Sequence, residues 1–116
     1  MGRRAARAAN SGGVDVLVHA AAKTGMVGFT RVLALEWAPY GIQVNAISPG
    51  MTYTQPSIDR ERDDPDGSRQ RLLDYVPAGR YGQPEEIAEL AFFLATTTAT
   101  YLHGENIVID GGYTIH

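Results

Sequence analysis

Apolar residues recur with a helical period in the first half of the chain. Between Val14 and Gly50 this pattern predicts one long helix over 16–37 and then one buried strand over 42–47. One apolar stripe of the helix comprises Ala22, Met26, Phe29, Leu33 and Trp37. A second apolar set, on other sides, comprises Val27, Val32 and Leu35. We therefore expect the helix to be covered on more than one side.

Residues near the ends of these two elements agree with the prediction. Asp15 is a suitable N-cap, and Pro39 ends the helix because proline disfavours the helical conformation in the residue before it. Gly41 turns the chain into the strand, and residues 48–50 end it. Asn45, inside the strand, is interpreted as a structural hydrogen-bonding residue.

The first 13 residues are rich in alanine and arginine and show no strand period. They close on a serine and two glycines, which predict a turn at 11–13. This segment is either a frayed helix or a disordered arm. We accordingly divide the chain into an N-terminal arm, 1–13, and a folded portion, 14–116.

Shorter elements follow the first strand. Charges of both signs, a proline and a glycine crowd the segment 51–67, which favours a surface loop over a substrate lid. Ser68 can cap a short helix over 69–75. A further helix begins at Pro84, because proline and the glutamates after it suit a helix N-terminus. It ends at threonines 96–98, whose helix propensity is low.

The C-terminal segment completes the predicted fold. The apolar run 107–109 indicates a short strand buried on both faces, as in a parallel sheet, and 110–112 form a turn. The order helix, strand, helix, helix, strand predicts an α/β fold with two parallel strands joined by a crossover.

Composition and charge exclude several classes of function. A net charge of −3 and a pI near 5.5 give no reason to expect nucleic acid or an anionic membrane as partner. The sequence has no cysteine, so disulfides and thiolate metal sites are excluded. His103 and His116 lack partners at metal-ligand spacing, so we expect no metal site. No apolar run approaches the roughly 20 residues of a membrane helix, and we expect a cytoplasmic protein.

Three stretches resemble the short-chain dehydrogenases and reductases in order and spacing. They read HAAAKTGMVGFTRVLALEWAPYGIQVNAISPG, GRYGQPEEIAELAFFLAT and YLHGENIVIDGG. The resemblance covers about Ala6 to Tyr113 and concerns the C-terminal half of the family's domain. It implies the last two strands of a Rossmann-type sheet, with flanking helices. It also implies an oxidoreductase that moves a hydride between NAD(H) or NADP(H) and an alcohol or carbonyl carbon.

The resemblance implies the candidate catalytic residues. In the family, a tyrosine exchanges a proton with the substrate oxygen, and a lysine four residues later lowers its pKa and holds the nicotinamide ribose. Lys23 matches the lysine, whereas His19 stands at the tyrosine and Ala6 at the orienting serine. A neutral imidazole can accept a proton, so His19 and Lys23 are the candidate catalytic residues. Alternatively, His19 drifted after catalysis was lost and Lys23 is an ordinary surface lysine. Ser11 is a poor substitute for the serine.

The resemblance also implies a nicotinamide-side loop after the first strand. Its candidate cofactor-binding residues, besides Lys23, are Pro49, Gly50, Thr52 and Thr54. Thr54 matches a family threonine that contacts the carboxamide or phosphate, whereas Thr52 replaces a usual aliphatic residue. A strand-ending turn accounts for Pro49 and Gly50 equally well. The family's glycine-rich pyrophosphate loop is absent from the 116 residues.

Two functions from different classes remain open. The chain is either a truncated NAD(P)-dependent oxidoreductase of an alcohol or carbonyl substrate, without autonomous activity, or a non-enzymatic remnant that packs on a full-length relative. A two-stranded parallel pair is a poor independent structure, and we expect an open strand edge and exposed apolar surface on the long helix. These features predict homo-oligomers or association with a relative. The long helix and the turn 110–112 are the expected contact surfaces.

Overall fold

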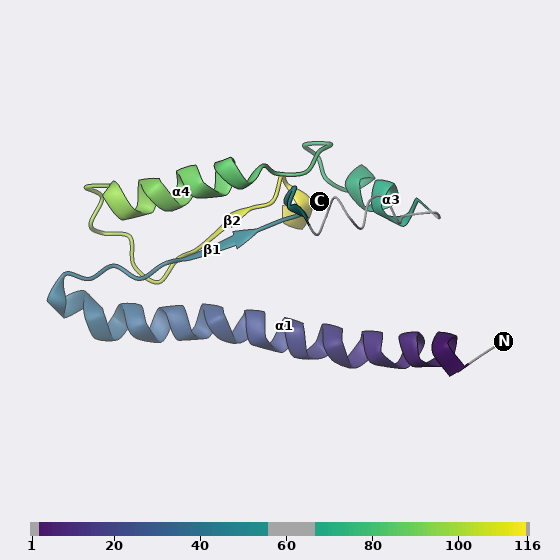
Figure 1. Cartoon of the computed structure of the whole chain (residues 1–116). Helices are drawn as coiled ribbons and strands as arrows, with labels where there is room; N and C mark the ends of the chain where they lie inside the picture. Colours follow the sequence, from purple (N-terminus) through teal and green to yellow (C-terminus); the bar gives the residue numbers. More distant parts are fainter. Residues whose placement is uncertain (1–2, 56–66, 116) are drawn as a thin grey trace. The chain divides into compact units, whose positions relative to one another are not determined.

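The fold is taken from a computed structural model, which describes residues 3–55 and 67–115, with side chains for 17–55, 67 and 70–115. Its helices and strands occur in the order predicted from the sequence (Figure 1). The chain divides into two compact units. One comprises Met1–Ala46 with Leu102–Glu105, and the other comprises Ile47–Tyr101 with Asn106–His116.

The first unit is dominated by the helix α1, Arg3–Trp37. It begins well before Asp15, so the predicted N-cap and the turn at 11–13 are wrong. Alanine and arginine are among the best helix formers, and those at 3–9 extend the helix through the weaker residues that follow. Whether 1–13 acts as an arm apart from 14–116 stays a prediction.

The C-terminal end of α1 follows the sequence signals. The 3₁₀ turn η1, Ala38–Tyr40, continues from Trp37 and carries Pro39 in its first turn. Gly41 then adopts a positive φ of 72°, which glycine reaches without steric cost, and its N–H donates to the Ala38 carbonyl at 3.0 Å. The predicted helix end and turn are therefore confirmed.

The buried side of α1 is not the predicted stripe. Thr30 and Ala34 are only 6% and 3% exposed, whereas Met26 and Phe29 are 57% and 56% exposed. The Ala34 side chain lies near Gly104, where an added Cβ would come within 3.4 Å of it. Small side chains on this side allow the chain to approach closely, and the large apolar ones remain outside. The expected exposure of apolar surface on the helix is thus confirmed. The expectation that the apolar stripe with Met26 and Phe29 is covered is wrong.

Four hydrogen bonds join the segment after η1 to 102–105. The Gly104 N–H donates to the Val44 carbonyl and the Ala46 N–H to the Glu105 carbonyl, both at 2.8 Å. Between them the Asn45 amide donates to the Leu102 carbonyl at 3.0 Å and accepts from the Glu105 N–H at 3.1 Å. The structural role expected for Asn45 is confirmed.

The strand β1, Ala46–Pro49, begins later than the predicted 42–47. The Asn45 side chain bonds where a regular ladder would use the backbone, so the ladder starts only at Ala46. The strand β1 pairs with β2, Asn106–Ile109, in a two-stranded sheet. The Ser48 hydroxyl donates to the Asn106 side-chain oxygen at 2.6 Å. The two strands are parallel, which confirms the predicted α/β class.

Two helices connect the strands. The short helix α3, Ser68–Asp74, has Gly67 as its N-cap, so Ser68 is its first residue and not its cap. The helix α4, Pro84–Thr96, starts and ends as predicted. The half-buried side of α4 includes Ile87, Leu90 and Leu94, as expected, whereas Ala91 is exposed.

The expectation of a strand buried on both faces is wrong for β2, because Val108 is 46% exposed. A buried parallel sheet needs a layer over each face. The described residues leave the Val108 side of β2 incompletely covered. The choice between a surface loop and a lid concerns mainly residues 56–66, which lie outside the described part of the chain.

Candidate cofactor and substrate site

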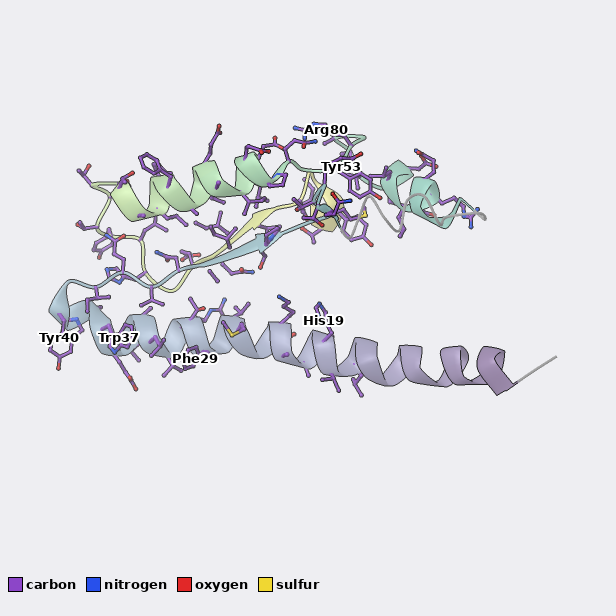
Figure 2. All side chains as sticks on the ribbon, in the orientation of Figure 1. His19, Phe29, Trp37, Tyr40, Tyr53 and Arg80 are labelled. Carbon is purple, nitrogen blue, oxygen red and sulfur yellow. The ribbon has the colours of Figure 1, made fainter. Side chains whose placement is uncertain are left out.

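The predicted catalytic pair lies on α1. His19 and Lys23 are four residues apart, which places them on one face of the helix, and both are exposed. Figure 2 shows His19 on one side of α1 and Phe29 on the other. The Ala6 and Ser11 side chains are outside the described set. The helix therefore presents an imidazole and an ammonium group one turn apart, both accessible to a ligand.

The candidate cofactor loop begins at the end of β1. The Gly50 N–H donates to the Ile109 carbonyl at 2.9 Å, which holds the loop against the end of β2. A Cβ at Gly50 would lie 2.6 Å from the Asp110 Cα, so only glycine fits without displacement. The Thr52 hydroxyl donates to the Gly50 carbonyl at 3.1 Å, and Thr54 is exposed. Pro49, Gly50 and Thr52 thus form one compact turn for which Gly50 is sterically required.

A second segment, around Gly82, holds this loop by hydrogen bonds. This contact was not predicted from the sequence. The Tyr53 N–H donates to the Gly82 carbonyl at 2.8 Å, and the Gly82 N–H donates to the Met51 carbonyl at 2.9 Å. Together they make a parallel bridge between Thr52 and Gly82. The rings of Tyr53 and Tyr81 are tilted by 57° with centroids 5.9 Å apart. No local sequence signal indicates this pairing, because its partners are far apart in the chain.

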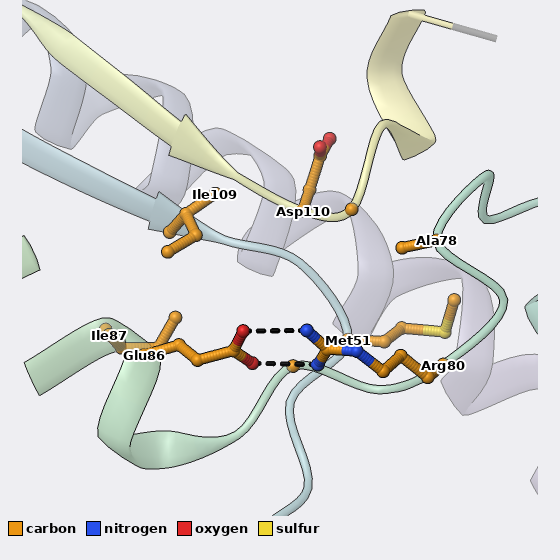
Figure 3. A pocket seen from close by; sticks show the side chains of 9 residues that line it. Met51, Ala78, Arg80, Glu86, Ile87, Ile109 and Asp110 are labelled. Carbon is orange, nitrogen blue, oxygen red and sulfur yellow. Dashed lines mark hydrogen bonds and ion pairs between the residues drawn. The ribbon is translucent and has the colours of Figure 1, made fainter. Parts of the chain in front are cut away.

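The bridging segment is in turn held by the start of α4. The Arg80 guanidinium and the Glu86 carboxylate form two parallel bonds of 2.8 Å (Figure 3). Glu86 also accepts the Gln83 N–H at 2.7 Å, completing a capping box with Gln83. These bonds, from Arg80 first and then from the Gln83 backbone, lower the pKa of Glu86 to about 2. The same pairing raises the pKa of Arg80.

The sequence indicated part of this arrangement. The glutamates after Pro84 were expected to complement the helix N-terminus, and the spacing of Gln83 and Glu86 fits a capping box. The bond from Arg80 was missed. A bidentate pair between residues six apart depends on the path of the turn, which spacing alone does not specify.

Asp110 organises the turn after β2. Its carboxylate accepts the N–H groups of Gly112 and Thr114, each at 2.9 Å, and points away from the Arg80–Glu86 pair in Figure 3. A hydrogen bond from the Thr114 side chain first, and then these backbone bonds, lower the pKa of Asp110. Gly111 has a positive φ of 67°, and an added Cβ would lie 2.9 Å from the Val76 side chain. The predicted turn at 110–112 is confirmed, and its glycines are required by packing.

A cavity of roughly 210 Å³ lies beyond the carboxyl ends of both strands. Its lining residues are Met51, Ala78, Arg80, Gly82, Glu86, Ile87, Ile109, Asp110 and Gly111. Open α/β sheets bind ligands outside the carboxyl ends of their strands. The cofactor loop and the cavity therefore lie at the edge of the sheet where this class of fold places its ligands.

Other kinds of site find no support in the described part of the chain. Residues 3–55 and 67–115 contain no group of three or more side chains that could hold a metal ion. None of the helices in these ranges has the length and hydrophobicity of a membrane span.

Comparison with known proteins identifies the family. The family described as enoyl-(acyl carrier protein) reductase matches residues 3–114. The NAD-dependent glycerol dehydrogenase of Listeria innocua is 44% identical over 85% of this chain and 38% of its own length. The 2-dehydro-3-deoxy-D-gluconate 5-dehydrogenase of Dickeya dadantii is 42% identical over 88% of this chain and 40% of its own.

Solved structures give the same result. A short-chain dehydrogenase of Bacillus anthracis superposes with a TM-score of 0.66 and 42% identity, over 84% of this chain and 35% of that one. A candidate NAD(P)-dependent gluconate 5-dehydrogenase of Beutenbergia cavernae, with bound NADP, has a TM-score of 0.76 and 39% identity, over 84% and 38%. The chain spans about two fifths of the length of the curated relatives it matches. It belongs to the short-chain dehydrogenase/reductase family.

Proposed function

We propose that this chain forms the nicotinamide-side part of an NAD(P)-dependent oxidoreductase that acts on an alcohol or carbonyl substrate. The observation that carries the proposal is the built loop at the carboxyl end of β1. There Gly50 is sterically required, and the backbone of Met51 and Tyr53 is fixed by two hydrogen bonds. Such a loop offers defined polar groups to a carboxamide at the usual ligand edge of the fold.

The residues of this chain fit the nicotinamide end of the cofactor. Pro49 and Gly50 would shape the loop, the backbone of Thr52 would meet the carboxamide, and Thr54 would contact the carboxamide or the phosphate. By the family resemblance, Lys23 on α1 would hold the ribose. The nicotinamide, when bound, donates or accepts the hydride. His19 would take the proton of the alcohol oxygen in the oxidative direction and return it in the reductive one. The 116 residues contain no glycine-rich pyrophosphate loop, so pyrophosphate binding would require residues outside them.

The relatives suggest which substrates to assay first. Glycerol, 2-dehydro-3-deoxy-D-gluconate, threitol and galactitol dehydrogenases are among them, and their named substrates carry several oxygen functions on neighbouring carbons. We therefore propose small polyols and their keto forms as the substrate class.

A second candidate function is an interaction module without catalysis. It is favoured by His19 and Ala6 at the family's tyrosine and serine positions, and by the exposed Met26 and Phe29 on α1. In that case the chain would pack on a second copy or on a full-length relative through apolar helix surface. Cofactor binding separates the two functions.

Titration with NADH and NADPH, followed by cofactor fluorescence on protein of known oligomeric state, tests the proposal. Micromolar binding supports the oxidoreductase and contradicts the non-enzymatic module. Absence of binding at millimolar cofactor contradicts autonomous catalysis.

A further inference from the structure

The turn before α4 is fixed by a cluster of charge-assisted hydrogen bonds. Glu86 accepts two bonds of 2.8 Å from Arg80 and one of 2.7 Å from the Gln83 N–H. Arg80 also donates to the Tyr81 carbonyl at 2.9 Å. The Glu86 carboxylate therefore fixes both ends of the short segment 80–83, which we call the clasp segment.

The middle of the clasp segment contacts the cofactor loop. Gly82 donates its N–H to the Met51 carbonyl and accepts the Tyr53 N–H, at 2.9 and 2.8 Å. A Cβ at Gly82 would lie 3.7 Å from the Met51 carbonyl oxygen and 3.9 Å from the Thr52 hydroxyl. The position of Gly82 therefore helps to set the position of the loop backbone at Met51 and Tyr53.

The Arg80–Glu86 pair is better suited to orientation than to stability. Both side chains are substantially exposed, at 57% and 40%, and exposed ion pairs contribute little to folding. A bidentate guanidinium–carboxylate pair nevertheless fixes direction, because two parallel bonds define a plane. In Figure 3 the two groups meet face to face beside Met51, at the wall of the cavity.

We propose that Glu86 is a positioning residue, which acts through Arg80 and Gly82 to fix the backbone of Met51–Tyr53 in the loop that receives the nicotinamide carboxamide. The naming of this ligand rests on the proposed function, whereas the mechanical link between Glu86 and the loop does not. Glu86 itself makes no hydrogen bond to the loop among the described residues, so its effect passes through the clasp segment.

Amide hydrogen exchange of the cofactor-free chain, measured residue by residue by NMR, tests this link. Glu86→Gln is the informative variant, because glutamine still serves at this position of a capping box but cannot form the charged pair. We expect exchange of the Tyr53 and Gly82 amides to accelerate by roughly tenfold, since both become part of a locally open segment. The Gly50 amide, bonded to β2, should change by less than about twofold.

Two further variants complete the test. Glu89→Gln, one turn later on α4 at an exposed position, is the matched control and should leave all three amides unchanged. Arg80→Lys keeps the charge and loses the planar fork, so it should accelerate Tyr53 and Gly82 partially. If Glu86→Gln does not fold, Arg80→Lys still tests whether the Arg80–Glu86 pair fixes the loop.

Unchanged Tyr53 and Gly82 amides in Glu86→Gln would overturn the proposal. Equal acceleration of the Gly50 amide would also overturn it, because that pattern reports general loosening of the unit. Since no cofactor is present, failure here leaves the oxidoreductase proposal standing, and failure of the cofactor titration leaves the exchange result standing.

Discussion

At the scale of single residues, close backbone approach explains the glycine at the start of the cofactor loop. The position of a Cβ at Gly50 falls 2.6 Å from both the Cα and the Cβ of Asp110, a separation that real side chains do not reach. The absence of a side chain at Gly50 thus allows the ends of β1 and β2 to approach each other closely. Glycine here serves packing, whether or not a cofactor follows it.

We predict that Gly50→Ala destabilises the chain by about 1–3 kcal/mol, the usual cost of overpacking. Gly25→Ala is the matched control, because nothing lies within 4 Å of an added Cβ at this position of α1. The control should stabilise by roughly 0.5–1 kcal/mol, since alanine is the better helix former. Urea unfolding of the two variants measures both effects. Similar stability of the two would contradict the steric account.

Lys23 is the only lysine of the sequence, which allows a selective probe. Reductive methylation with ¹³C labels Lys23 and the N-terminal amine alone. If Lys23 holds the nicotinamide ribose, adding NADH should shift the Lys23 signal and leave the N-terminal signal in place. Adenosine monophosphate is the control ligand, because it lacks the nicotinamide ribose. A shift of equal size with both ligands would argue against the proposed role.

At the scale of elements, prediction from sequence succeeded where the signals are local. The start of α4 at Pro84 and the turn after β2 depend on residues that are neighbours in the chain, so their chemistry is readable from spacing. The predicted start of β1 was wrong because the Asn45 side chain donates a hydrogen bond to Leu102 and accepts one from Glu105, both in a distant segment. The contacts of the cofactor loop with Gly82 are likewise non-local and were missed.

The prediction of which side of α1 is covered was wrong for a different physical reason. Size and apolarity favoured Met26 and Phe29, whereas the chain approaches the helix at Thr30 and Ala34, where side chains are small. Close approach to a helix favours small residues even when a larger apolar stripe is available. A periodic pattern reports which side can be buried, and tertiary contact decides which side is buried.

The Glu86 carboxylate at the start of α4 gives a prediction about how stability changes at acid pH. The folded-state pKa of Glu86, about 2, lies below its ordinary value of 4.5, so its contribution to stability is present above pH 4.5. That contribution is lost as the pH falls from about 4.5 to about 2. Arg80 stays charged throughout, and Asp110, which lines the same cavity, titrates in the same direction.

We therefore expect wild-type protein to be more stable than Glu86→Gln at pH 6, with the difference disappearing near pH 2. Thermal melts followed by circular dichroism at several pH values measure it. Asp110 is present in both proteins, so its titration largely cancels in the difference. A difference that is constant between pH 6 and pH 2 would mean that the carboxylate charge of Glu86 does not matter.

At the scale of the whole molecule, few of the described side chains are buried. Ala34 and Val76 are the only buried apolar residues among the described side chains, and β1 and β2 form a sheet of two strands. Parallel sheets ordinarily have further strands and a layer over each face. The curated relatives are about two and a half times as long as the part that matches this chain. This thin core favours association as a source of additional burial.

Met26 and Phe29 are three residues apart on α1, hence on one side of the helix, and both are more than half exposed. We predict that the chain self-associates at micromolar concentration through this apolar side, because burial there removes large side chains from water. Sedimentation velocity over a concentration series measures it. Replacing both residues with glutamate should weaken association by at least about tenfold, as expected when central apolar contacts are lost. Tyr101→Ser, a change at a fully exposed aromatic outside α1, is the control and should not weaken it. A monomer with a sharp melting transition across the series would show that the described core suffices alone.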